Sequence, residues 1–294
     1  MRDHCRWWSV LLSFVLLSQP FAMGYQEAGP REAIKGTVSF DLYRGYLIVA
    51  RGSAGPLHDL TFLLDTGASP TVLDPRLARK LHLEQSPASI SVLGGSVHAE
   101  TAIVPSLSFG PVQRDDVSVL IEDLSFLQKA LPVRVDGVIG LDVLGQSAFV
   151  IDYASREIHF GPSRPLPNAI PLRVTDGLAI VDAEVNDVAA HLLLDTGASS
   201  LILFARSMPG PVADLKISAV QRPPDTIGEF ERKQMRLHSL RLGTAEFGQE
   251  PAFVVSDSSH AGRAFDGLMS PAALGITRIA IDLGRGELAF SRQK

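Results

Sequence analysis

The chain has 294 residues, a length that suits two domains of ordinary size, and 46% of them are hydrophobic, enough to pack a core in each domain. The net charge of −5 offers no basic patch, so nucleic acid is not expected as a partner. Cys5 is the single cysteine, and the eight histidines lack the spacing of metal ligands, so we expect neither a metal site nor a cofactor.

The first 24 residues are predicted to be a signal peptide. Arg2 and Arg6 are basic, residues 7–17 are apolar apart from two serines, and Ala22-Met23-Gly24 offers small residues for cleavage before Tyr25. An apolar run of about 11 residues is too short to span a bilayer comfortably. We therefore expect export to the periplasm or the extracellular space, with no membrane contact after cleavage. Anchoring through an uncleaved signal is the alternative.

The pattern beyond the N-terminus is mainly that of β-strands. Apolar and polar residues alternate from 38 to 42, and Arg44-Gly45 can then turn the chain into a second apolar strand. The second half follows the same plan. It has an apolar strand over 178–185, a turn at Asn186-Asp187 and a return strand over 188–194.

Helical signals are few and short. A helix is predicted over 75–83, with Asp74 as its N-cap and proline at its first position. A second helix is predicted over 124–131. Residues 141–144 and 271–274 read as matching single turns in the two halves.

One seven-residue string, Leu-Leu-Asp-Thr-Gly-Ala-Ser, occurs twice in the chain. The first copy covers residues 63–69 and the second covers residues 193–199. In each copy an apolar strand leads into an aspartate on a tight turn, at Asp65 and at Asp195. Two such carboxylates in one chain suggest a paired-aspartate active site, the arrangement that activates water for peptide-bond hydrolysis.

The two halves share one register over most of their length. Asp65 and Asp195 are 130 positions apart (195 − 65), and so are the downstream segments that begin at Asp136-Gly137 and Asp266-Gly267 (266 − 136). Each half then ends with a strand, a turn and a strand. The chain therefore contains two copies of one domain. The predicted boundaries of signal peptide, N-terminal lobe, proline-rich linker and C-terminal lobe are 1–24, 30–161, 162–171 and 172–294.

The motif Asp-Thr-Gly-Ala-Ser after an apolar strand, with an apolar-apolar-Gly segment downstream, resembles the aspartic proteases. Two copies in one chain are similar to the bilobed pepsin arrangement. Ala68 and Ala198, which follow the motif glycines, resemble retropepsins, because pepsin-like enzymes usually carry Ser or Thr there. The resemblance is to a single-chain, two-lobed fusion of retropepsin-like domains. It implies an all-β, bilobal acid-protease fold, with two homologous β-barrel-like lobes and a few short helices. Two lobes in one chain form an intramolecular pseudo-dimer, so we expect a monomer.

The resemblance implies that Asp65 and Asp195 are the catalytic residues. Two carboxylates a few ångströms apart share one proton, because like charges repel. The charged member takes a proton from water, and the protonated member stabilises the oxyanion that forms on the scissile carbonyl. Thr66 and Thr196 are expected to hydrogen-bond across the lobe interface, as the family's threonines do.

The residues after each threonine are expected to tune the carboxyl pair. Gly67 and Gly197 let each turn bring backbone N–H groups close to the carboxylates. Ala68 and Ala198 lack the hydroxyl that would stabilise the ionised form. We therefore expect a higher apparent pKa, and activity at milder acidity, than in a pepsin.

Substrate-binding residues are expected near the motifs and on a mobile hairpin. Ser69 and Ser199 occupy positions where family members contact the substrate backbone, although a serine there can equally cap the turn. The paired glycines Gly94 and Gly95 suit the tip of a flap hairpin. The matching stretch of the second half, around Gly228, is charged and proline-rich, so a second flap is not expected there.

One departure from symmetry and two further carboxylates need an interpretation. Gly140 is matched by Ser270, which puts the geometry of the second lobe in question. Asp136 and Asp266 are interpreted as turn-capping or solvent-facing carboxylates rather than catalytic groups.

The sequence thus predicts an aspartic endopeptidase that acts on exported or extracellular polypeptides. The alternative is a catalytically inactive peptide-binding module on the same fold. Tyr25 to Gly36, about a dozen residues, are too few for a pepsin-type prosegment, so activation by removal of a long inhibitory segment is not expected.

Overall fold

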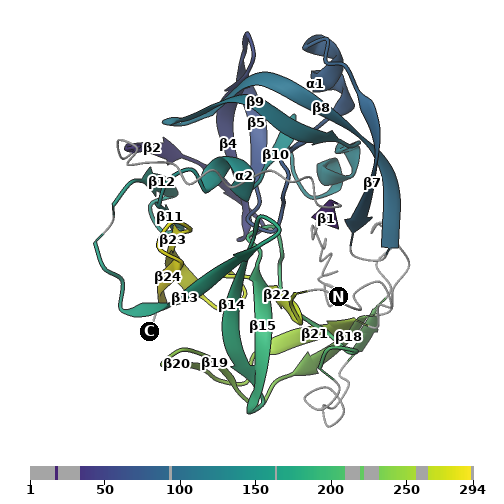
Figure 1. Cartoon of the computed structure of the whole chain (residues 1–294). Helices are drawn as coiled ribbons and strands as arrows, with labels where there is room; N and C mark the ends of the chain where they lie inside the picture. Colours follow the sequence, from purple (N-terminus) through teal and green to yellow (C-terminus); the bar gives the residue numbers. More distant parts are fainter. Residues whose placement is uncertain are drawn as a thin grey trace, which may run out of the picture.

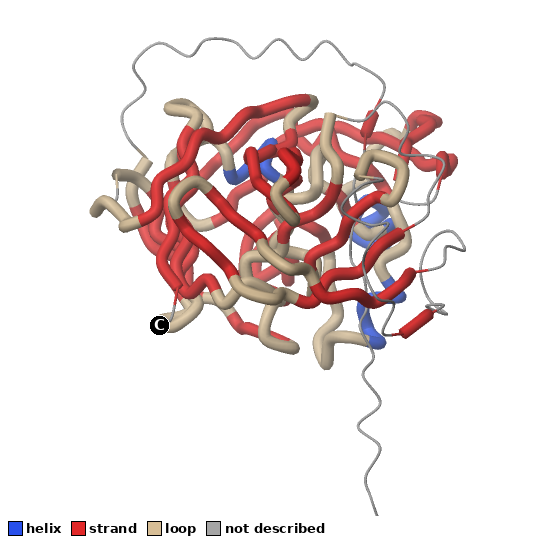
Figure 2. Tube along the Cα trace, turned by 90° about the horizontal axis from the view of Figure 1, so that it is seen from below, coloured by secondary structure: helices blue, strands red, loops and turns tan. Residues whose placement is uncertain are grey.

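A computed structural model of the chain describes residues 17–18, 34–92, 95–162, 164–208, 219–221, 232–255 and 264–292. The predicted signal peptide lies outside these residues, except for Leu17–Ser18, which form strand β1 along strand β7 (Ser86–Val92). Among the described residues, no helix is long and apolar enough to cross a membrane. Strands dominate the architecture and the helices are short (Figure 2).

The fold is all-β and bilobal (Figure 1). The first lobe contains β3 (Asp41–Tyr43), β4 (Leu47–Ala54), β5 (Leu57–Leu64), β6 (Val72–Leu73), α1 (Pro75–Lys80), β7, β8 (Gly95–Phe109), β9 (Val112–Ile121), the 3-10 helix η1 (Ser125–Lys129), β10 (Gly137–Ile139) and α2 (Leu141–Leu144). The second lobe contains β14 (Leu178–Val185), β15 (Val188–Leu194), β16 (Leu201–Phe204), β17 (Ala219–Gln221), β18 (Arg232–Arg236), β19 (Leu240–Leu242), β20 (Ala245–Phe247), β21 (Pro251–Val255) and β22 (Gly267–Met269).

One sheet joins the two lobes, at the left of Figure 1. Its strands come from the beginning and the end of each half of the chain. Its strand order is β2 (Gly36–Ser39), β12 (Glu157–Phe160), β11 (Phe149–Asp152), β23 (Ile276–Asp282), β24 (Glu287–Arg292) and β13 (Asn168–Thr175). The strand-turn-strand pairs predicted at the end of each half, β11–β12 and β23–β24, meet at its centre through β11 and β23. The lobes are therefore linked by backbone hydrogen bonds within one chain.

The strand pairings around the two motifs are the same. In the first lobe β10 runs parallel to β5 and antiparallel to β6, and β6 runs parallel to β9. In the second lobe β22 runs parallel to β15 and antiparallel to β16, and β16 runs parallel to β21. The repeat seen in the sequence is therefore a repeat of topology.

Alternate residues of the motif strands face different cores, because strand side chains alternate between the two faces. Phe62 and Leu192 belong to a large buried cluster that extends through both lobes and the shared sheet. Leu63 lies in a cluster whose buried members all come from the first lobe, and Leu193 lies in one from the second lobe. The strands that lead to the aspartates are thus packed on both faces.

Several predicted elements differ from the structure in their boundaries or type. Asp74 caps α1 as expected, but the helix ends at Lys80 rather than at residue 83, because the next residues close it with turn hydrogen bonds. The second predicted helix is the shorter 3-10 helix η1. Residues 271–274 form a turn where the first lobe has α2. Strand β13 begins at Asn168, inside the stretch predicted as linker.

Candidate active site

Each aspartate follows directly from a buried strand. Strands β5 and β15 end one residue before Asp65 and Asp195, and the last residues of both strands are fully buried. The N–H of Asp65 donates to the carbonyl of Ile139 (3.0 Å), and the N–H of Asp195 donates to the carbonyl of Met269 (3.0 Å). The parallel neighbours β10 and β22 therefore position the start of each motif turn.

Asp136 and Asp266 hold these parallel strand pairs together at their far ends. Asp136 Oδ2 accepts a hydrogen bond from the N–H of Thr61 (2.9 Å), and Asp266 Oδ2 accepts one from the N–H of His191 (2.8 Å). The N–H groups of both aspartates donate back to the carbonyls of the same residues. The interpretation of these carboxylates as structural groups is confirmed.

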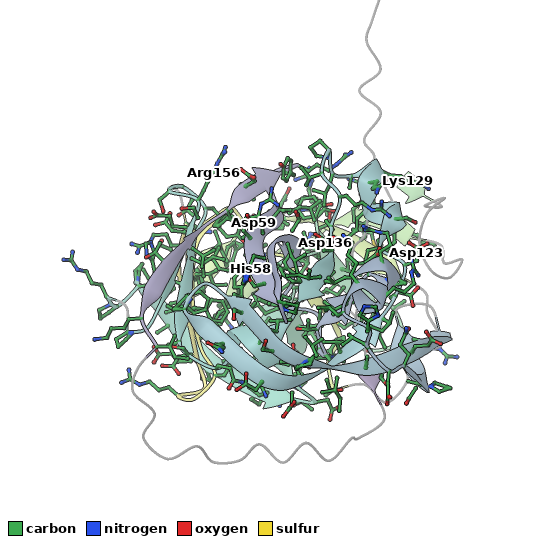
Figure 3. The ribbon with its side chains drawn as sticks, turned by 90° about the horizontal axis from the view of Figure 1, so that it is seen from above. His58, Asp59, Asp123, Lys129, Asp136 and Arg156 are labelled. Atoms are coloured by element: carbon green, nitrogen blue, oxygen red, sulfur yellow. The ribbon has the colours of Figure 1, made fainter. Side chains whose placement is uncertain are left out.

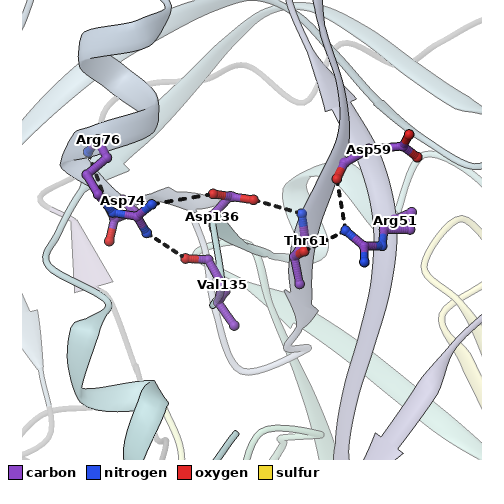
Figure 4. Close-up of polar contacts among 7 residues, drawn as sticks. All are labelled: Arg51, Asp59, Thr61, Asp74, Arg76, Val135 and Asp136. Atoms are coloured by element: carbon purple, nitrogen blue, oxygen red, sulfur yellow. Dashed lines mark hydrogen bonds and ion pairs between the residues drawn. The ribbon is translucent and has the colours of Figure 1, made fainter. Parts of the chain in front are cut away.

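An arginine extends this support to helix α1. Arg76 forms an ion pair with Asp74 (2.8 Å), lies 3.8 Å from a carboxylate oxygen of Asp136, and donates to the carbonyl of Val135 (3.3 Å) (Figure 4). Seen from the first-lobe end, Asp136 and Asp59 lie on the outer side of that lobe (Figure 3). This network sits at the other end of β10 from the motif aspartate, so it supports the strand rather than the chemistry.

The two motif threonines bond across the lobe interface. Thr66 Oγ1 donates to the carbonyl of Leu194 (2.9 Å) and accepts from the N–H of Thr196 (3.1 Å). Thr196 Oγ1 donates to the carbonyl of Leu64 (3.3 Å) and accepts from the N–H of Thr66 (3.0 Å). The hydrogen bonds expected between the lobes are present, and they tie each motif to the strand of the other lobe.

The motif glycines let the two turns approach each other closely. A Cβ atom added at Gly197 would lie 2.6 Å from Asp65 Oδ2, and one added at Gly67 would lie 2.8 Å from Asp195 Cγ. Carbon atoms do not approach non-bonded groups so closely, so neither position can take a side chain without moving a carboxyl group. The glycines therefore bring Asp65 and Asp195 together.

In each carboxyl group, Oδ1 accepts hydrogen bonds from the backbone and Oδ2 does not. Asp65 Oδ1 accepts from the N–H of Gly67 (2.8 Å) and of Gly197 (3.3 Å), and Asp195 Oδ1 accepts from the N–H of Ala198 (2.8 Å). Both Oδ2 atoms are buried, and neither has a donor from the described residues. The two carboxyl groups interact as a pair, and a hydrogen bond between them requires that one of them carries a proton.

Burial is the main reason that both groups hold a proton more tightly than a free aspartate. It raises the pKa of Asp65 to about 6, against the lowering effect of its hydrogen bonds. Burial also raises the pKa of Asp195 well above its ordinary value, and the neighbouring charge of Asp65 raises it further. The titration of these two groups therefore belongs to the pair rather than to either residue. Burial is the main cause of the raised values, and the effect of the missing hydroxyls at Ala68 and Ala198 stays a prediction.

The serines predicted to contact substrate lie against the opposite lobe. The side chain of Ser199 bonds to that of Tyr46, whose buried ring belongs to the first-lobe cluster. Gly177 packs on Ser69 from the second lobe, where an added Cβ would lie 2.4 Å from Ser69 Oγ. Both serines thus contribute to the lobe interface, and substrate contact by Ser69 and Ser199 stays a prediction.

Hairpins occur at both positions compared for flaps. Strands β7 and β8 pair as far as Val92 and Gly95, so Gly95 begins the return strand of the expected hairpin, and Gly94 lies outside the described residues. In the second lobe β17 and β18 pair with each other, and Gly228 between them also lies outside the described residues.

A buried polar pair braces the first motif turn and was not singled out from the sequence. Thr71 Oγ1 donates to Asp142 Oδ1 (2.8 Å), and the N–H of Gly140 donates to Thr71 Oγ1 (3.1 Å). Burial raises the pKa of Asp142, although the bonds from Thr71 act against it. The corresponding residues of the second lobe are Leu201 and Ala272, so this brace exists in one lobe only. Sequence patterns do not mark such a pair, because its members are distant in the chain.

Comparisons with known proteins place this geometry in context. Residues 52–143 match the model of a family described as "Aspartyl protease". No match to a curated protein was found. The chain is similar to a retropepsin-like aspartic protease from Rickettsia conorii, with 22% identity, 42% of this chain and 89% of that chain covered, and a TM-score of 0.31. It is also similar to Basic 7S globulin from soybean, with 13% identity, 90% of this chain and 96% of that chain covered, and a TM-score of 0.45. The family match includes the first Asp-Thr-Gly-Ala-Ser turn, so this part of the first lobe is similar to the aspartyl proteases.

Proposed function

We propose that the protein is an aspartic endopeptidase that hydrolyses peptide bonds with water activated by Asp65 and Asp195. The observation that carries the proposal is the pairing of two buried carboxyl groups, one from each lobe, that bond to each other. Such a pair shares one proton at pH values where isolated carboxyl groups would both be ionised. It presents a base and an acid side by side.

In the proposed reaction one carboxyl group acts as the base and the other as the acid. Asp65, as the carboxylate, takes a proton from water while the water oxygen attacks the scissile carbonyl carbon. Asp195, as the acid, hydrogen-bonds the carbonyl oxygen and stabilises the tetrahedral intermediate. Asp65 then returns the proton to the departing amine as the C–N bond breaks. The apparent pKa values belong to the pair rather than to either residue.

Substrate access requires movement around the pair. Asp65 and Asp195 have no exposed surface in the structure. A polypeptide can reach them only when the surrounding segments open, as lids do in many enzymes. The hairpin of β7 and β8 is our candidate for this movement, because its strands pair as far as Val92 and Gly95, where the sequence predicts a flap.

Cleavage of an unfolded protein, with and without pepstatin, tests the proposed function. We expect fragmentation that pepstatin suppresses, because pepstatin inhibits aspartic proteases. The competing function is a catalytically inactive peptide-binding module. Saturable peptide binding with no fragments at any pH would favour that module and contradict the endopeptidase.

Cleavage is expected to be fastest at weakly acidic to neutral pH. Because burial raises the pKa of Asp65 to about 6, its carboxylate is lost as the pH falls through that value. Because the pKa of Asp195 is raised well above its ordinary value, its protonated form persists at pH values where a free aspartate would be ionised. A profile of kcat/KM between about pH 2 and pH 8 measures both limbs. A maximum near pH 2, typical of pepsin-like pairs, would contradict the expectation. Circular dichroism at each pH shows whether the fold persists.

We further propose that the protein is exported and acts as a monomer on exported or extracellular polypeptides. Export is supported by the basic and apolar pattern of residues 1–24. A monomer is supported by the shared sheet, in which one chain supplies the strands that join the lobes. Fractionation of the producing cells and sedimentation of the purified protein test these two points.

A further inference from the structure

The carbonyl of the motif alanine accepts a hydrogen bond from a different kind of donor in each lobe. In the first lobe, the N–H of Leu141 donates to the carbonyl of Ala68 (3.1 Å). The matching residue of the second lobe is Pro271 (141 + 130), and proline has no N–H. There the hydroxyl of Ser270 donates to the carbonyl of Ala198 instead (2.6 Å).

We propose that Ser270 is a positioning residue for Asp195, whose hydroxyl replaces the backbone donor that Pro271 lacks. Ser270 and Ala198 are both fully buried. The N–H of Ala198 donates to Asp195 Oδ1 (2.8 Å), so the residue held by Ser270 is the one that holds the carboxyl group. Without the hydroxyl, the buried carbonyl of Ala198 would lose the donor that fixes it.

The first lobe shows why the N–H of residue 141 and a serine hydroxyl at the position before it would not fit together. A Cβ atom at Gly140, the counterpart of Ser270, would lie 2.4 Å from the carbonyl oxygen of Ala68. The N–H donor of Leu141 therefore requires a residue without a Cβ before it. Pro271 has no N–H, and the serine before it supplies the donor through its hydroxyl. The pairs Gly140-Leu141 and Ser270-Pro271 are two solutions to the same requirement, a donor for the carbonyl of the motif alanine.

Ser270 has a second contact that offers a simpler role. Its Oγ also accepts from the N–H of Ala273 (3.3 Å), so it caps the turn that begins at Pro271. A turn cap alone would stabilise the second lobe without orienting Asp195. The two roles separate when a donor is returned to position 271, because a new N–H there can serve the carbonyl of Ala198 but cannot accept from Ala273.

The test compares Ser270→Ala, Pro271→Ala and the double variant Ser270→Gly/Pro271→Ala with wild type, because a backbone donor at position 271 needs glycine before it, as Gly140 precedes Leu141. The inference rests on the proposed function, so kcat and KM for peptide cleavage are the first readouts. Ser270→Ala is expected to lower kcat by roughly 10-fold with KM unchanged, because a small displacement of a reacting group lowers the rate without removing a substrate contact. Pro271→Ala is expected to leave kcat unchanged. The double variant is expected to regain most of the lost rate.

A second readout does not depend on activity. The N–H of Ala198 lowers the pKa of Asp195, so Ser270→Ala is expected to raise the pH at which that carboxyl titrates, measured by carbon-13 NMR. The double variant should return it toward wild type. Asp65, Tyr46 and Tyr153, the titratable groups that interact with Asp195, are the same in every variant.

The outcomes separate the two proposals. If wild type cleaves no peptide, the proposed function fails, and the titration still decides the role of Ser270. A Ser270→Ala variant with wild-type kcat and titration would overturn the positioning role. So would a double variant as impaired as Ser270→Ala, which indicates a turn cap only. If Ser270→Ala does not fold, recovery of folding in the double variant supports the proposal and continued failure overturns it.

Discussion

Replacing either Asp65 or Asp195 with asparagine is expected to lower kcat/KM for cleavage of an unfolded protein by roughly 10³-fold or more. Asparagine has nearly the same shape and fits between the same backbone donors. It cannot accept the proton of the attacking water, and it cannot share a proton with the opposite carboxyl group. Each variant therefore removes the acid–base pair and leaves its surroundings in place.

A matched control is Asp282→Asn. Asp282 Oδ1 accepts from the N–H of Arg285 (2.9 Å) in an exposed turn, a bond that an amide oxygen can also accept. We expect this variant to cleave at the wild-type rate. Wild-type cleavage by Asp195→Asn would contradict the catalytic assignment. Equal activity of all three variants would point to a contaminating protease.

Loss of folding is not expected to explain the loss of activity. The folded-state pKa values of Asp65 and Asp195 are raised, so the folded protein keeps protons that the unfolded chain releases. For a carboxyl group, a raised folded-state pKa stabilises the folded protein at low pH. This stabilisation is lost as the pH rises through the folded pKa. Asparagine does not ionise, so at pH 7 the variants should unfold in urea at the wild-type concentration or higher.

Gly197→Ala and Gly67→Ala are expected to lower kcat/KM by roughly 10²-fold or more and to reduce the free energy of unfolding by about 1–3 kcal/mol. The added methyl at Gly197 would lie 2.6 Å from Asp65 Oδ2, and that at Gly67 would lie 2.8 Å from Asp195 Cγ. Because each turn is tied to the other by the bonds of Thr66 and Thr196, the clash moves a carboxyl group rather than separating the lobes. Kinetics and urea unfolding measure the two effects.

Gly248→Ala provides the control for these substitutions. A Cβ at Gly248 meets no atom within 4 Å, so we expect unchanged kinetics and a change in unfolding free energy within about 0.5 kcal/mol. If Gly197→Ala also retained wild-type kcat/KM, the close approach of the two turns would not be required for catalysis. A proton shared between Asp65 and Asp195 would then not depend on this close approach.

The repeated string and its constant offset were sufficient to predict a two-lobed β fold with one aspartate from each lobe. This succeeded because the motif is local: an apolar strand, an aspartate and a glycine turn are contiguous in the chain. Helix ends were predicted less well. Helix α1 stops at Lys80, three residues short of the predicted end at residue 83, because tertiary packing and turn bonds close it, and neither is visible in its own sequence.

Contacts between distant residues could not be predicted in this way. Tyr46 reaches Ser199 from the other lobe, and Thr71 donates to Asp142 through a partly buried bond. Neither pair has a local pattern, because the partners meet only after both lobes have folded. The departure at Ser270 was visible in the sequence, but only the structure shows that its hydroxyl serves Ala198.

By itself, the sequence predicted the class of chemistry, because two copies of an aspartate on a glycine turn, 130 residues apart, point to a pair of carboxyl groups. The tertiary structure decided how those groups behave. It buried Asp65 and Asp195 completely and set the glycine of each turn against the carboxyl group of the other. Desolvation raises both pKa values, and the nearby charge of Asp65 raises that of Asp195 further. Both effects depend on how the two turns meet across the lobe interface. Those distances exist only once the chain has folded around the shared sheet.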